Sequence, residues 1–358
     1  MGSFRHQSMT DPQKIKINHR LYYPRELVLG TDPWQTSLLG FLNNWFDRND
    51  YIEIQTSGST GEPKKFRLKK QNMLASASLT CNYFGLNESH SALLCLPADY
   101  IAGKMMVVRA IYSGMNLIPV KPSADPFKDL SEHVDFAAIT PYQFAHSHES
   151  LKSHPVKNII VGGSQVSFHL QQMMNSLESN FYETYGMTET CSHIALRKLN
   201  GNDASDVFDV LPGIDIGTDA RGCLVIHAPA LSGQELVTND MVDLRDDKHF
   251  KWLGRFDNVI NTGGIKIFPE QVEKKLEPFI SRRFFISYLP DEMLNQKLIL
   301  ILEGEPLKFS ENEALLQNID RVLNRFEKPK EIVTVEKFEV SSSQKILKNK
   351  ILSQIRSL

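Results

Sequence analysis

A loop rich in glycine and hydroxyl side chains occupies residues 56–65 and follows a short apolar run, Ile52–Gln55, that predicts a strand. Glycines let backbone N–H groups turn toward an anion, hydroxyls donate further hydrogen bonds, and a lysine adds positive charge. The loop differs from a Walker A sequence, because Pro63 and Lys65 stand where that pattern needs Gly and Ser or Thr. The alternative is a surface turn of small polar residues. We expect the loop to bind the β- and γ-phosphates of a nucleotide through Thr56, Ser57, Gly58, Ser59, Thr60, Gly61 and Lys64.

Alternating strand and helix patterns surround this loop and must position it. A helix beginning at Pro141 has Thr140 before it as a cap. This alternation predicts an α/β fold whose large N-terminal domain holds a doubly wound, mostly parallel sheet. The other predicted elements are strands at residues 92–96, 115–120, 136–139, 158–161 and 181–184, and helices at residues 73–84, 101–112 and 167–177.

The pattern changes toward the C-terminus. Short β-like runs at residues 224–227, 235–238 and 249–253 predict a β-hairpin region within the large domain. From Asn258 onward the spacing predicts a compact α+β unit. Its predicted elements are strands at residues 258–261, 284–288, 298–302 and 332–335, and helices at residues 269–276, 311–323 and 347–358. We therefore expect a large domain over residues 1–256 and a small domain over residues 257–358.

The composition is that of an ordinary globular protein. Of 358 residues, 41% are hydrophobic and 23% are charged, and the formal net charge at pH 7 is −2. This balance argues against a protein whose main role is to coat nucleic acid or an anionic membrane. The four cysteines match neither a disulfide framework nor a zinc cluster. With no signal-peptide pattern and no apolar run near ~18 residues, the sequence predicts a cytoplasmic enzyme.

Residues 56–64 have the sequence TSGSTGEPK. This run closely resembles the signature loop of the adenylate-forming superfamily, which includes acyl- and aryl-CoA synthetases, peptide-synthetase adenylation domains and luciferases. Further motifs extend the resemblance from Tyr51 to Lys348. It implies that ATP, with Mg²⁺, activates a carboxylic acid as an acyl-adenylate, which coenzyme A then captures. The segment before the loop is short, which implies a trimmed first subdomain.

Residues 185–190, with the sequence YGMTET, resemble the second core motif of this superfamily. The resemblance implies that Tyr185 stacks on adenine, with Gly186 beside it. It also implies catalytic roles for Thr188, at the α-phosphate, and for Glu189, at Mg²⁺. A carboxylate oxygen suits this hard cation, and ligands of α/β folds bind at turns that follow parallel strands. A solvated carboxylate is the alternative for Glu189.

Three other stretches complete the implied nucleotide site. A turn after a predicted strand would let the backbone approach adenine, and it consists of Gly162, Gly163 and Ser164. Asp240 resembles the acidic residue that binds the ribose hydroxyls, although Asn239 stands where the superfamily has Gly. Arg255 resembles a second ribose contact. The alternatives are a simple strand-to-helix turn and a surface ion pair between Arg255 and Asp257.

A hinge and a mobile small domain follow from the same resemblance. Asp257 corresponds to the hinge, and the small domain would rotate about it between the two half-reactions. Gly263, Gly264 and Lys266 lie in a post-hinge motif that would line the channel for coenzyme A. The alternative for this stretch is a Gly-Gly turn before a helix that begins with proline.

Lys345 resembles the catalytic lysine near the C-terminus of these enzymes, which contacts the carboxylate and the nucleotide. Gln344 replaces the usual Gly and Lys348 replaces the usual Arg. A solvated lysine in a basic helix is the alternative.

The predicted helix over residues 101–112 resembles the pocket helix of o-succinylbenzoate–CoA ligases, the aryl-CoA synthetases of menaquinone biosynthesis. A dicarboxylic aromatic acid keeps one carboxylate free, and that group needs a cation or strong donors. The resemblance implies a substrate site formed by Tyr100, Lys104, Arg109, Ser192 and His193. Lys104 and Arg109 are separated by about 140° around a helix, so we expect only one of them to face the pocket.

The leading interpretation is an AMP-forming ligase that joins o-succinylbenzoate to coenzyme A. One alternative is the same chemistry on another acyl or aryl acid. Others are a non-catalytic nucleotide-binding homologue and an adenylating enzyme that loads a carrier protein. The expected partners are small molecules, without nucleic acid or membrane, and a homo-oligomer is left open.

Overall fold

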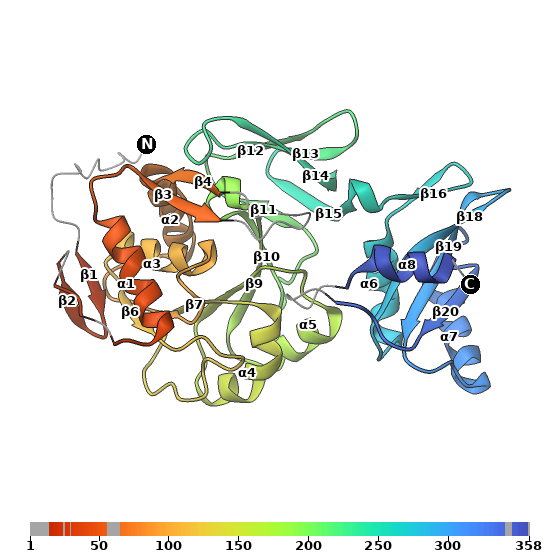
Figure 1. The fold of residues 1–358 in the computed structure, drawn as a ribbon, viewed down its shortest axis with the longest axis horizontal. Coiled ribbons are helices and arrows are strands. Elements are labelled where there is room, and N and C mark those ends of the chain that lie inside the picture. Colours follow the sequence, from red (N-terminus) through yellow and green to blue (C-terminus); the bar gives the residue numbers. More distant parts are fainter. Residues whose placement is uncertain (1–13, 24–25, 29, 56–64, 341–345, 357–358) are drawn as a thin grey trace.

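The structure is a computed structural model that describes residues 14–23, 26–28, 30–55, 65–340 and 346–356. A mixed sheet of thirteen strands forms the centre of the N-terminal part (Figure 1). Its strands are β1 (Ile15–Ile17), β2 (Arg20–Tyr22), β5 (Ser91–Leu94), β6 (Asn116–Pro119), β7 (Phe136–Ile139), β8 (Asn158–Val161), β9 (Asn180–Gly186), β10 (His193–Lys198), β11 (Phe208–Val210), β12 (Asp215–Thr218), β13 (Cys223–His227), β14 (Glu235–Leu244) and β15 (His249–Arg255).

The sheet has a parallel half and an antiparallel half that meet at β9. Strands β1, β6, β5, β7, β8 and β9 are parallel neighbours in that order. Beyond β9 the order β10, β11, β15, β14, β13, β12 is antiparallel throughout. The predicted doubly wound sheet and hairpin region are thus both present, and they form one continuous sheet.

Helices cover both faces of the parallel half. The helices α1 (Pro33–Trp45), α2 (Lys70–Phe84) and α3 (Ile101–Ser113) pack on one face, and α4 (Pro141–Ser153) and α5 (Phe168–Met174) pack on the other. Successive strand residues point to opposite faces, so Ala92 and Leu94 of β5 join the first core while Leu93 joins the second. The predicted cap is confirmed, because Gln143 N donates to Thr140 Oγ1 and Thr140 N donates to Gln143 Oε1.

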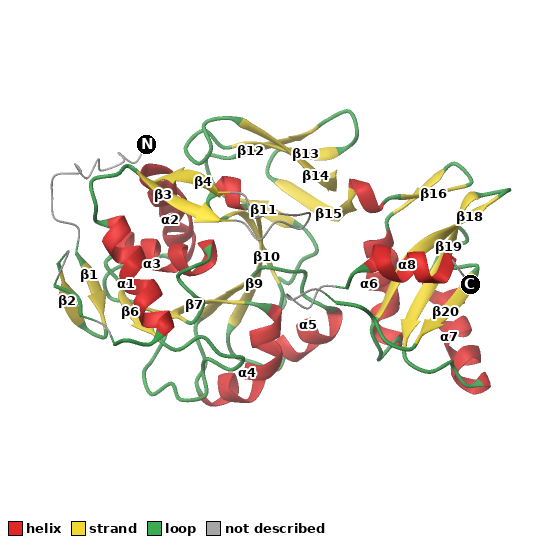
Figure 2. Ribbon diagram, in the orientation of Figure 1, coloured by secondary structure: helices red, strands yellow, loops and turns green. Residues whose placement is uncertain are grey.

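Residues from Ile260 onward form separate sheets and separate cores (Figure 2). Helices α6 and α7 pack on one side of a three-stranded sheet, and α8 packs on the other. The elements are β16 (Ile260–Thr262), β17 (Ile265–Ile267), α6 (Pro269–Leu276), β18 (Phe284–Asp291), β19 (Asn295–Glu303), α7 (Phe309–Val322), β20 (Glu331–Val335) and α8 (Lys348–Arg356).

The structure differs from the predicted elements in three places. The strand before residue 56, β3 (Tyr51–Gln55), does not join the large sheet but pairs with β4 (Lys65–Lys69) in a separate antiparallel hairpin. The predicted helix over residues 167–177 is shorter, because α5 has seven residues. Asn258 ends a 3₁₀ turn, η2 (Phe256–Asn258), rather than beginning a strand.

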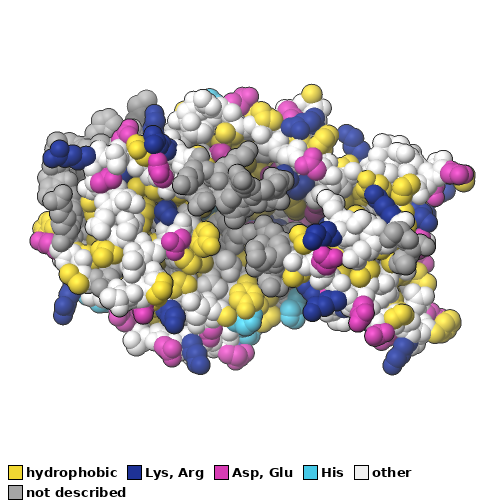
Figure 3. Space-filling view, in the orientation of Figure 1, with side chains coloured by type: hydrophobic (Ala, Val, Ile, Leu, Met, Phe, Trp, Pro, Cys, Tyr) yellow, Lys and Arg dark blue, Asp and Glu magenta, His cyan; other side chains and the backbone are white. Residues whose placement is uncertain are grey.

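The surface carries charges of both signs. Basic and acidic side chains are interspersed over the face in Figure 3, as the near-zero net charge predicts. Among the residues that the structure describes, no helix is both long and apolar enough to cross a membrane.

Candidate active site

Two cavities adjoin each other at the carboxyl ends of β8 and β9. The first, called the Tyr185 cavity, has a volume of about 290 Å³ and is lined in part by Ser164, Tyr185 and Trp252. The second, called the Arg109 cavity, has a volume of about 520 Å³ and is lined in part by Tyr100, Arg109, Thr188, Ser192 and His193. Both cavities are lined by Gly163, Thr184 and Gly186. A single ligand with two parts would therefore bridge them at the edge where parallel strands end.

Close backbone approach explains the small residues at this edge. A Cβ atom on Gly186 would lie 2.4 Å from Ser192 O, and one on Gly162 would lie 2.5 Å from Thr184 Oγ1. Gly163 has a φ of +90°, which L side chains rarely adopt. Gly162 is therefore required by its close approach to β9, and Gly186 by its close approach to the segment that follows β9.

Tyr185, which lines the Tyr185 cavity, is hydrogen-bonded to Asp240, which lies behind the lining residues. Tyr185 Oη donates to Asp240 Oδ2 at 2.8 Å, and Trp252 Nε1 donates to Asp240 Oδ1 at 3.2 Å. Arg255 Nε lies 3.9 Å from Asp240 Oδ1. Burial, with the Asp240 charge beside it, raises the pKa of Tyr185, so its phenol stays protonated. The structure thus brings together three residues that sequence analysis assigned to the nucleotide.

Thr188 and Glu189 lie in the short 3₁₀ turn η1 (Thr188–Thr190), which follows β9. Thr188 faces the Arg109 cavity, and the Glu189 side chain is exposed. Among the described residues, no group of three or more His, Cys, Asp or Glu side chains could hold a metal ion. One accessible carboxylate fits Mg²⁺ that is held mainly by substrate phosphates and water.

Arg109 is a buried cation at the base of the Arg109 cavity. Its side chain enters from α3 and is 1% exposed. Its Nη2 donates to Ser192 Oγ at 2.7 Å, while its Nε has no hydrogen-bond partner. No carboxylate among the described residues forms an ion pair with it. Burial lowers the pKa of Arg109 to about 10, so the guanidinium remains charged at neutral pH.

His193 lies next to this guanidinium and is also buried. Its Nδ1 lies 3.3 Å from Ser192 Oγ, and its Nε2 lies 3.2 Å from Thr80 Oγ1. Burial and the Arg109 charge lower the pKa of His193 well below its ordinary value, so the ring is neutral. Sequence analysis missed Thr80, although a polar residue between Ala77 and Phe84 on the apolar side of a predicted helix was a usable signal.

Lys104 does not face the Arg109 cavity, which corrects its predicted substrate role. Its Nζ donates to Ala98 O at 2.7 Å and to Asp99 O at 2.5 Å. The ammonium group therefore binds backbone carbonyl oxygens of the loop that precedes α3 and stabilises that loop. Arg109 alone of these two residues lines the cavity, in agreement with their angular separation on the helix. Tyr100 is 60% exposed and lies at the cavity mouth.

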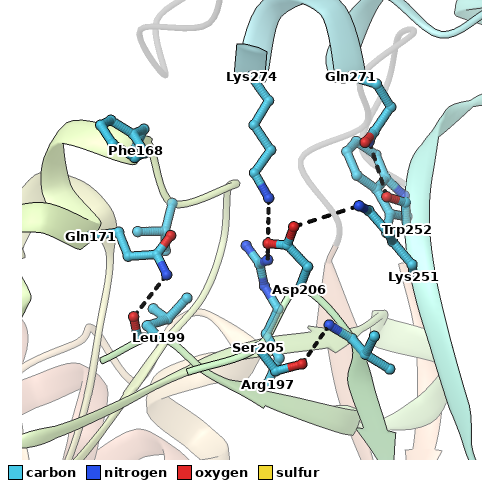
Figure 4. Close-up of polar contacts among 12 residues, drawn as sticks. Phe168, Gln171, Arg197, Leu199, Ser205, Asp206, Lys251, Trp252, Gln271 and Lys274 are labelled. Carbon is cyan, nitrogen blue, oxygen red and sulfur yellow. Dashed lines mark hydrogen bonds and ion pairs between the residues drawn. The ribbon is translucent and has the colours of Figure 1, made fainter. Parts of the chain in front are cut away.

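A network of charged residues lines the Tyr185 cavity on the side of β10 (Figure 4). Arg197 forms ion pairs with Glu183 and with Asp206. Lys274 Nζ also donates a hydrogen bond to Asp206 Oδ1 at 2.5 Å, and Lys251 Nζ lies 3.5 Å from Asp206 Oδ2. Sequence analysis missed this network, whose members come from separate elements.

Helix α6 of the C-terminal part lies against the Tyr185 cavity. It contributes Lys274 to the charged network. It also contributes Gln271, whose Nε2 donates to the carbonyl oxygens of Trp252 and Leu253 at 3.1 and 3.0 Å. These contacts join the C-terminal part to β15.

The remaining predicted residues of the C-terminal part lie in two places. Gly263, Gly264 and Lys266 belong to the β16–β17 hairpin, where Gly263 N donates to Leu294 O, and they do not line either cavity. Asp257 accepts a hydrogen bond from Asn239 Nδ2, so the residue that replaces glycine contacts the predicted hinge.

Eight predicted site residues lie outside the residues that the structure describes. They are Thr56, Ser57, Gly58, Ser59, Thr60, Gly61 and Lys64 of the loop, and Lys345.

Comparisons with known proteins show the family to which the chain is similar. The family model for "AMP-binding enzyme" matches residues 13–216. A protein of Haemophilus influenzae named 2-succinylbenzoate–CoA ligase is 26% identical over 297 residues, which cover 76% of this chain and 64% of that protein. An Escherichia coli protein of the same name is 24% identical over 290 residues, which cover 76% and 62%. The chain thus spans less than two thirds of the length of these relatives.

Solved structures have the same fold. A Dyadobacter fermentans protein described as "acyl-CoA synthetase (AMP-forming)/AMP-acid ligase II-like" has a TM-score of 0.61 and 33% identity, over 92% of this chain and 96% of that one. The O-succinylbenzoate coenzyme A synthetase of Bacillus subtilis, solved with ATP and a magnesium ion, has a TM-score of 0.70 and 21% identity, over 84% and 69%. Since the family model matches more than half of its length, the chain belongs to the AMP-binding enzyme family.

Proposed function

We propose that this protein is an AMP-forming acid–CoA ligase that converts o-succinylbenzoate to o-succinylbenzoyl-CoA through an acyl-adenylate. The observation that carries the proposal is the buried Arg109 guanidinium, which lacks a carboxylate partner among the described residues and lines a cavity that adjoins the Tyr185 cavity. The proposal implies ATP, Mg²⁺ and coenzyme A as co-substrates and a role in menaquinone biosynthesis in the cytoplasm.

The Tyr185 cavity would hold the adenosine part of the nucleotide. Asp240 is hydrogen-bonded to two residues that line this cavity, Tyr185 and Trp252, and the remaining lone pairs of its carboxylate would accept from ribose hydroxyls. Arg255, half-exposed beside Asp240, would make a second ribose contact. Gly163 lines this cavity without a side chain that would fill it, and Ser164 lines the same wall.

The Arg109 cavity would hold the acid. A dicarboxylic aromatic acid would place its unreacted carboxylate at the Arg109 guanidinium, where charge-assisted hydrogen bonds are strong. Its other carboxylate would then lie toward Gly163, Gly186 and Thr188, where the two cavities adjoin. A buried cation with an unused N–H group favours an anionic ligand over a neutral one.

Joining an acid to ATP requires two anions to approach each other. At ~4 Å and an effective dielectric of ~20, each pair of like charges opposes this by about 4 kcal/mol. Mg²⁺ bound near Glu189 would supply positive charge at the phosphates. Thr188 would donate to the α-phosphate, and by resemblance the loop at residues 56–64 and Lys345 would add further donors where negative charge develops.

Thioester formation would use a second arrangement of the same chain. Rotation about Asp257 would separate Lys274 from Asp206 and Gln271 from β15, and it would bring the turn at Gly263, Gly264 and Lys266 toward the adenylate. This motion is part of the proposal and follows from the resemblance.

Pyrophosphate release measured with a panel of carboxylic acids, with and without coenzyme A, tests the proposal. We expect o-succinylbenzoate to release pyrophosphate and to yield its CoA thioester, which mass spectrometry identifies. Release of pyrophosphate with another acid only would mean that this other acid is the substrate. Transfer of the acyl group to a carrier protein but not to coenzyme A would mean that the enzyme loads a carrier protein. No release with any acid, from folded protein that binds Mg-ATP, would contradict the enzyme proposal.

A further inference from the structure

A chain of hydrogen bonds runs beneath the Arg109 cavity and connects α2 to α3. It begins at the Ser76 carbonyl and passes through Thr80, His193 and Ser192 to Arg109. Thr80 is fully buried, and His193 is 4% exposed. Thr80 does not line the cavity, so its contact with His193 lies away from the open space of the cavity.

The direction of each bond follows from the chemistry of its atoms. Thr80 Oγ1 lies 3.3 Å from Ser76 O, a carbonyl that only accepts, so the single hydroxyl hydrogen of Thr80 is used there. Thr80 Oγ1 is then left to accept from His193 Nε2, and we therefore assign the proton of the neutral ring to Nε2. His193 Nδ1 is consequently an acceptor and receives the Ser192 hydroxyl hydrogen. Ser192 Oγ is left to accept from Arg109 Nη2.

We propose that Thr80 is a positioning residue for the acid site: it fixes His193 in the Nε2–H tautomer and thereby orients Ser192, which holds the Arg109 guanidinium at the cavity. The proposal rests on the proposed function, in which that cavity binds an acid with a second carboxylate. Thr80 itself does not line the cavity, so its effect reaches the ligand only through its neighbours.

Loss of the Thr80 hydroxyl would disturb each hydrogen bond between Thr80 and Arg109 in turn. The His193 Nε2–H group would lose its acceptor in a buried place, which favours a rotated ring or the other tautomer. In the other tautomer, Nδ1–H would donate to Ser192 Oγ, and the Ser192 hydroxyl hydrogen would lose Nδ1 as its acceptor. The Ser192 side chain would then no longer be fixed, and it is the single described hydrogen-bond partner that orients the Arg109 guanidinium.

Two matched substitutions test this role. Thr80→Val keeps the shape of the side chain and removes the hydroxyl, and Thr80→Ser keeps the hydroxyl. We expect Thr80→Val to raise the KM for o-succinylbenzoate about tenfold, equivalent to about 1.4 kcal/mol. The KM for ATP should stay within about twofold, and Thr80→Ser should return the KM for the acid to near the wild-type value. An unchanged KM for the acid in Thr80→Val, or an equal rise in both KM values, would overturn the proposal.

NMR of the histidine ring gives a readout that does not need turnover. With ¹⁵N-labelled histidine, the wild type should show His193 as a neutral ring with its proton on Nε2, assigned with His193→Gln. Thr80→Val should lose this signature while its overall spectrum remains that of a folded protein. A proton on Nδ1 in the wild type would overturn the assignment even if the enzyme is active. The predicted NMR change in a protein without acid activation would instead refute the proposed function and leave the tautomer assignment supported.

Discussion

Arg109 and Arg197 are both buried arginines beside the candidate active site, but their surroundings differ. They are 1% and 5% exposed, respectively. Arg197 forms ion pairs with Glu183 and Asp206, and its guanidinium lies 5.3 Å from the Phe208 ring centroid. Arg109 contacts one serine hydroxyl and leaves its Nε without a partner. Removal of one partner from a buried ion pair leaves the other charge uncompensated and destabilises the fold, whereas a buried charge without a protein partner indicates a place for a ligand.

Secondary structure explains why one charge is paired and the other is not. Arg197 of β10 and Glu183 of β9 are direct partners in the antiparallel register, so the sheet brings them together. Arg109 lies in the middle of α3, where its side chain passes between α2 and the segment that follows β9. Stability should therefore depend on Arg197, and acid binding should depend on Arg109.

Replacement of Arg197 should have the largest effect on stability. Arg197→Met would leave Glu183 as an uncompensated buried charge, and we expect a loss of about 3–5 kcal/mol in the free energy of unfolding. Urea unfolding followed by circular dichroism measures this. The double variant Arg197→Met/Glu183→Leu should recover part of the loss. A loss below about 1 kcal/mol in the single variant would contradict the comparison.

Replacement of Arg109 should have its main effect on the acid. Arg109→Met removes a charge-assisted contact, so kcat/KM for o-succinylbenzoate should fall about a hundredfold while the KM for ATP stays near its wild-type value. The free energy of unfolding should stay the same or rise, because a buried charge without an acidic partner is lost. A variant as unstable as Arg197→Met, with unchanged acid kinetics, would show that Arg109 is structural.

The neutral state of His193 predicts a dependence of stability on pH. Its pKa is well below the ordinary value of 6.5 in the folded protein, because of burial and the Arg109 charge. The unfolded chain therefore binds a proton that the folded one does not, and this contribution to stability is complete above pH 6.5 and declines as the pH falls.

The matched variant His193→Gln isolates this contribution. Between pH 6.5 and about pH 5.5, the wild type should lose about 1 kcal/mol more unfolding free energy than this variant. Urea unfolding at both pH values measures the difference. Parallel losses in the two proteins would show that His193 is not held neutral.

The smallest effect should come from the exposed end of the paired network. Lys274→Met removes the ion pair with Asp206, whose side chains are 28% and 47% exposed, so the cost in unfolding free energy should be below about 1 kcal/mol. The cost should shrink as salt is added, because partly exposed charges are screened. A cost as large as that of Arg197→Met would mean that the contact between α6 and the large sheet carries much of the stability.

Local signals in the sequence predicted much of the fold. Helices α2 and α3 end at or next to their predicted last residues, where Gly85 and Gly114 have φ values of +66° and +74°. The predicted cap at Thr140 is also present, and both features depend on single short segments. Strands β7 and β8 and helix α6 have their predicted bounds. The β3–β4 hairpin was missed, although Phe66 and Leu68 alternate with basic residues in β4 and this alternation was a usable strand signal.

The site was predicted less completely, because its polar contacts join distant parts of the chain. Tyr185, Arg109, Ser192 and His193 were predicted through motifs, and the structure brings them to two adjoining cavities. Asp240 and Arg255 were predicted in the same way, and they lie next to Tyr185. The Arg197–Glu183 pair depends on strand register, and the Thr80–His193 contact spans 113 positions. Lys104 was assigned to the substrate site because its positive charge suggested that it binds an anionic ligand. In the structure its ammonium group donates to backbone carbonyl oxygens instead.

The central claim is that Arg109 binds a second carboxylate of the acid. It is tested most directly by comparing kcat/KM for o-succinylbenzoate and for 4-oxo-4-phenylbutanoate, which lacks the ring carboxylate, in the wild type and in Arg109→Met. We predict a preference of about a hundredfold for the dicarboxylate in the wild type and almost none in the variant. Equal values for both acids in the wild type, or a preference that survives in Arg109→Met, would contradict the claim.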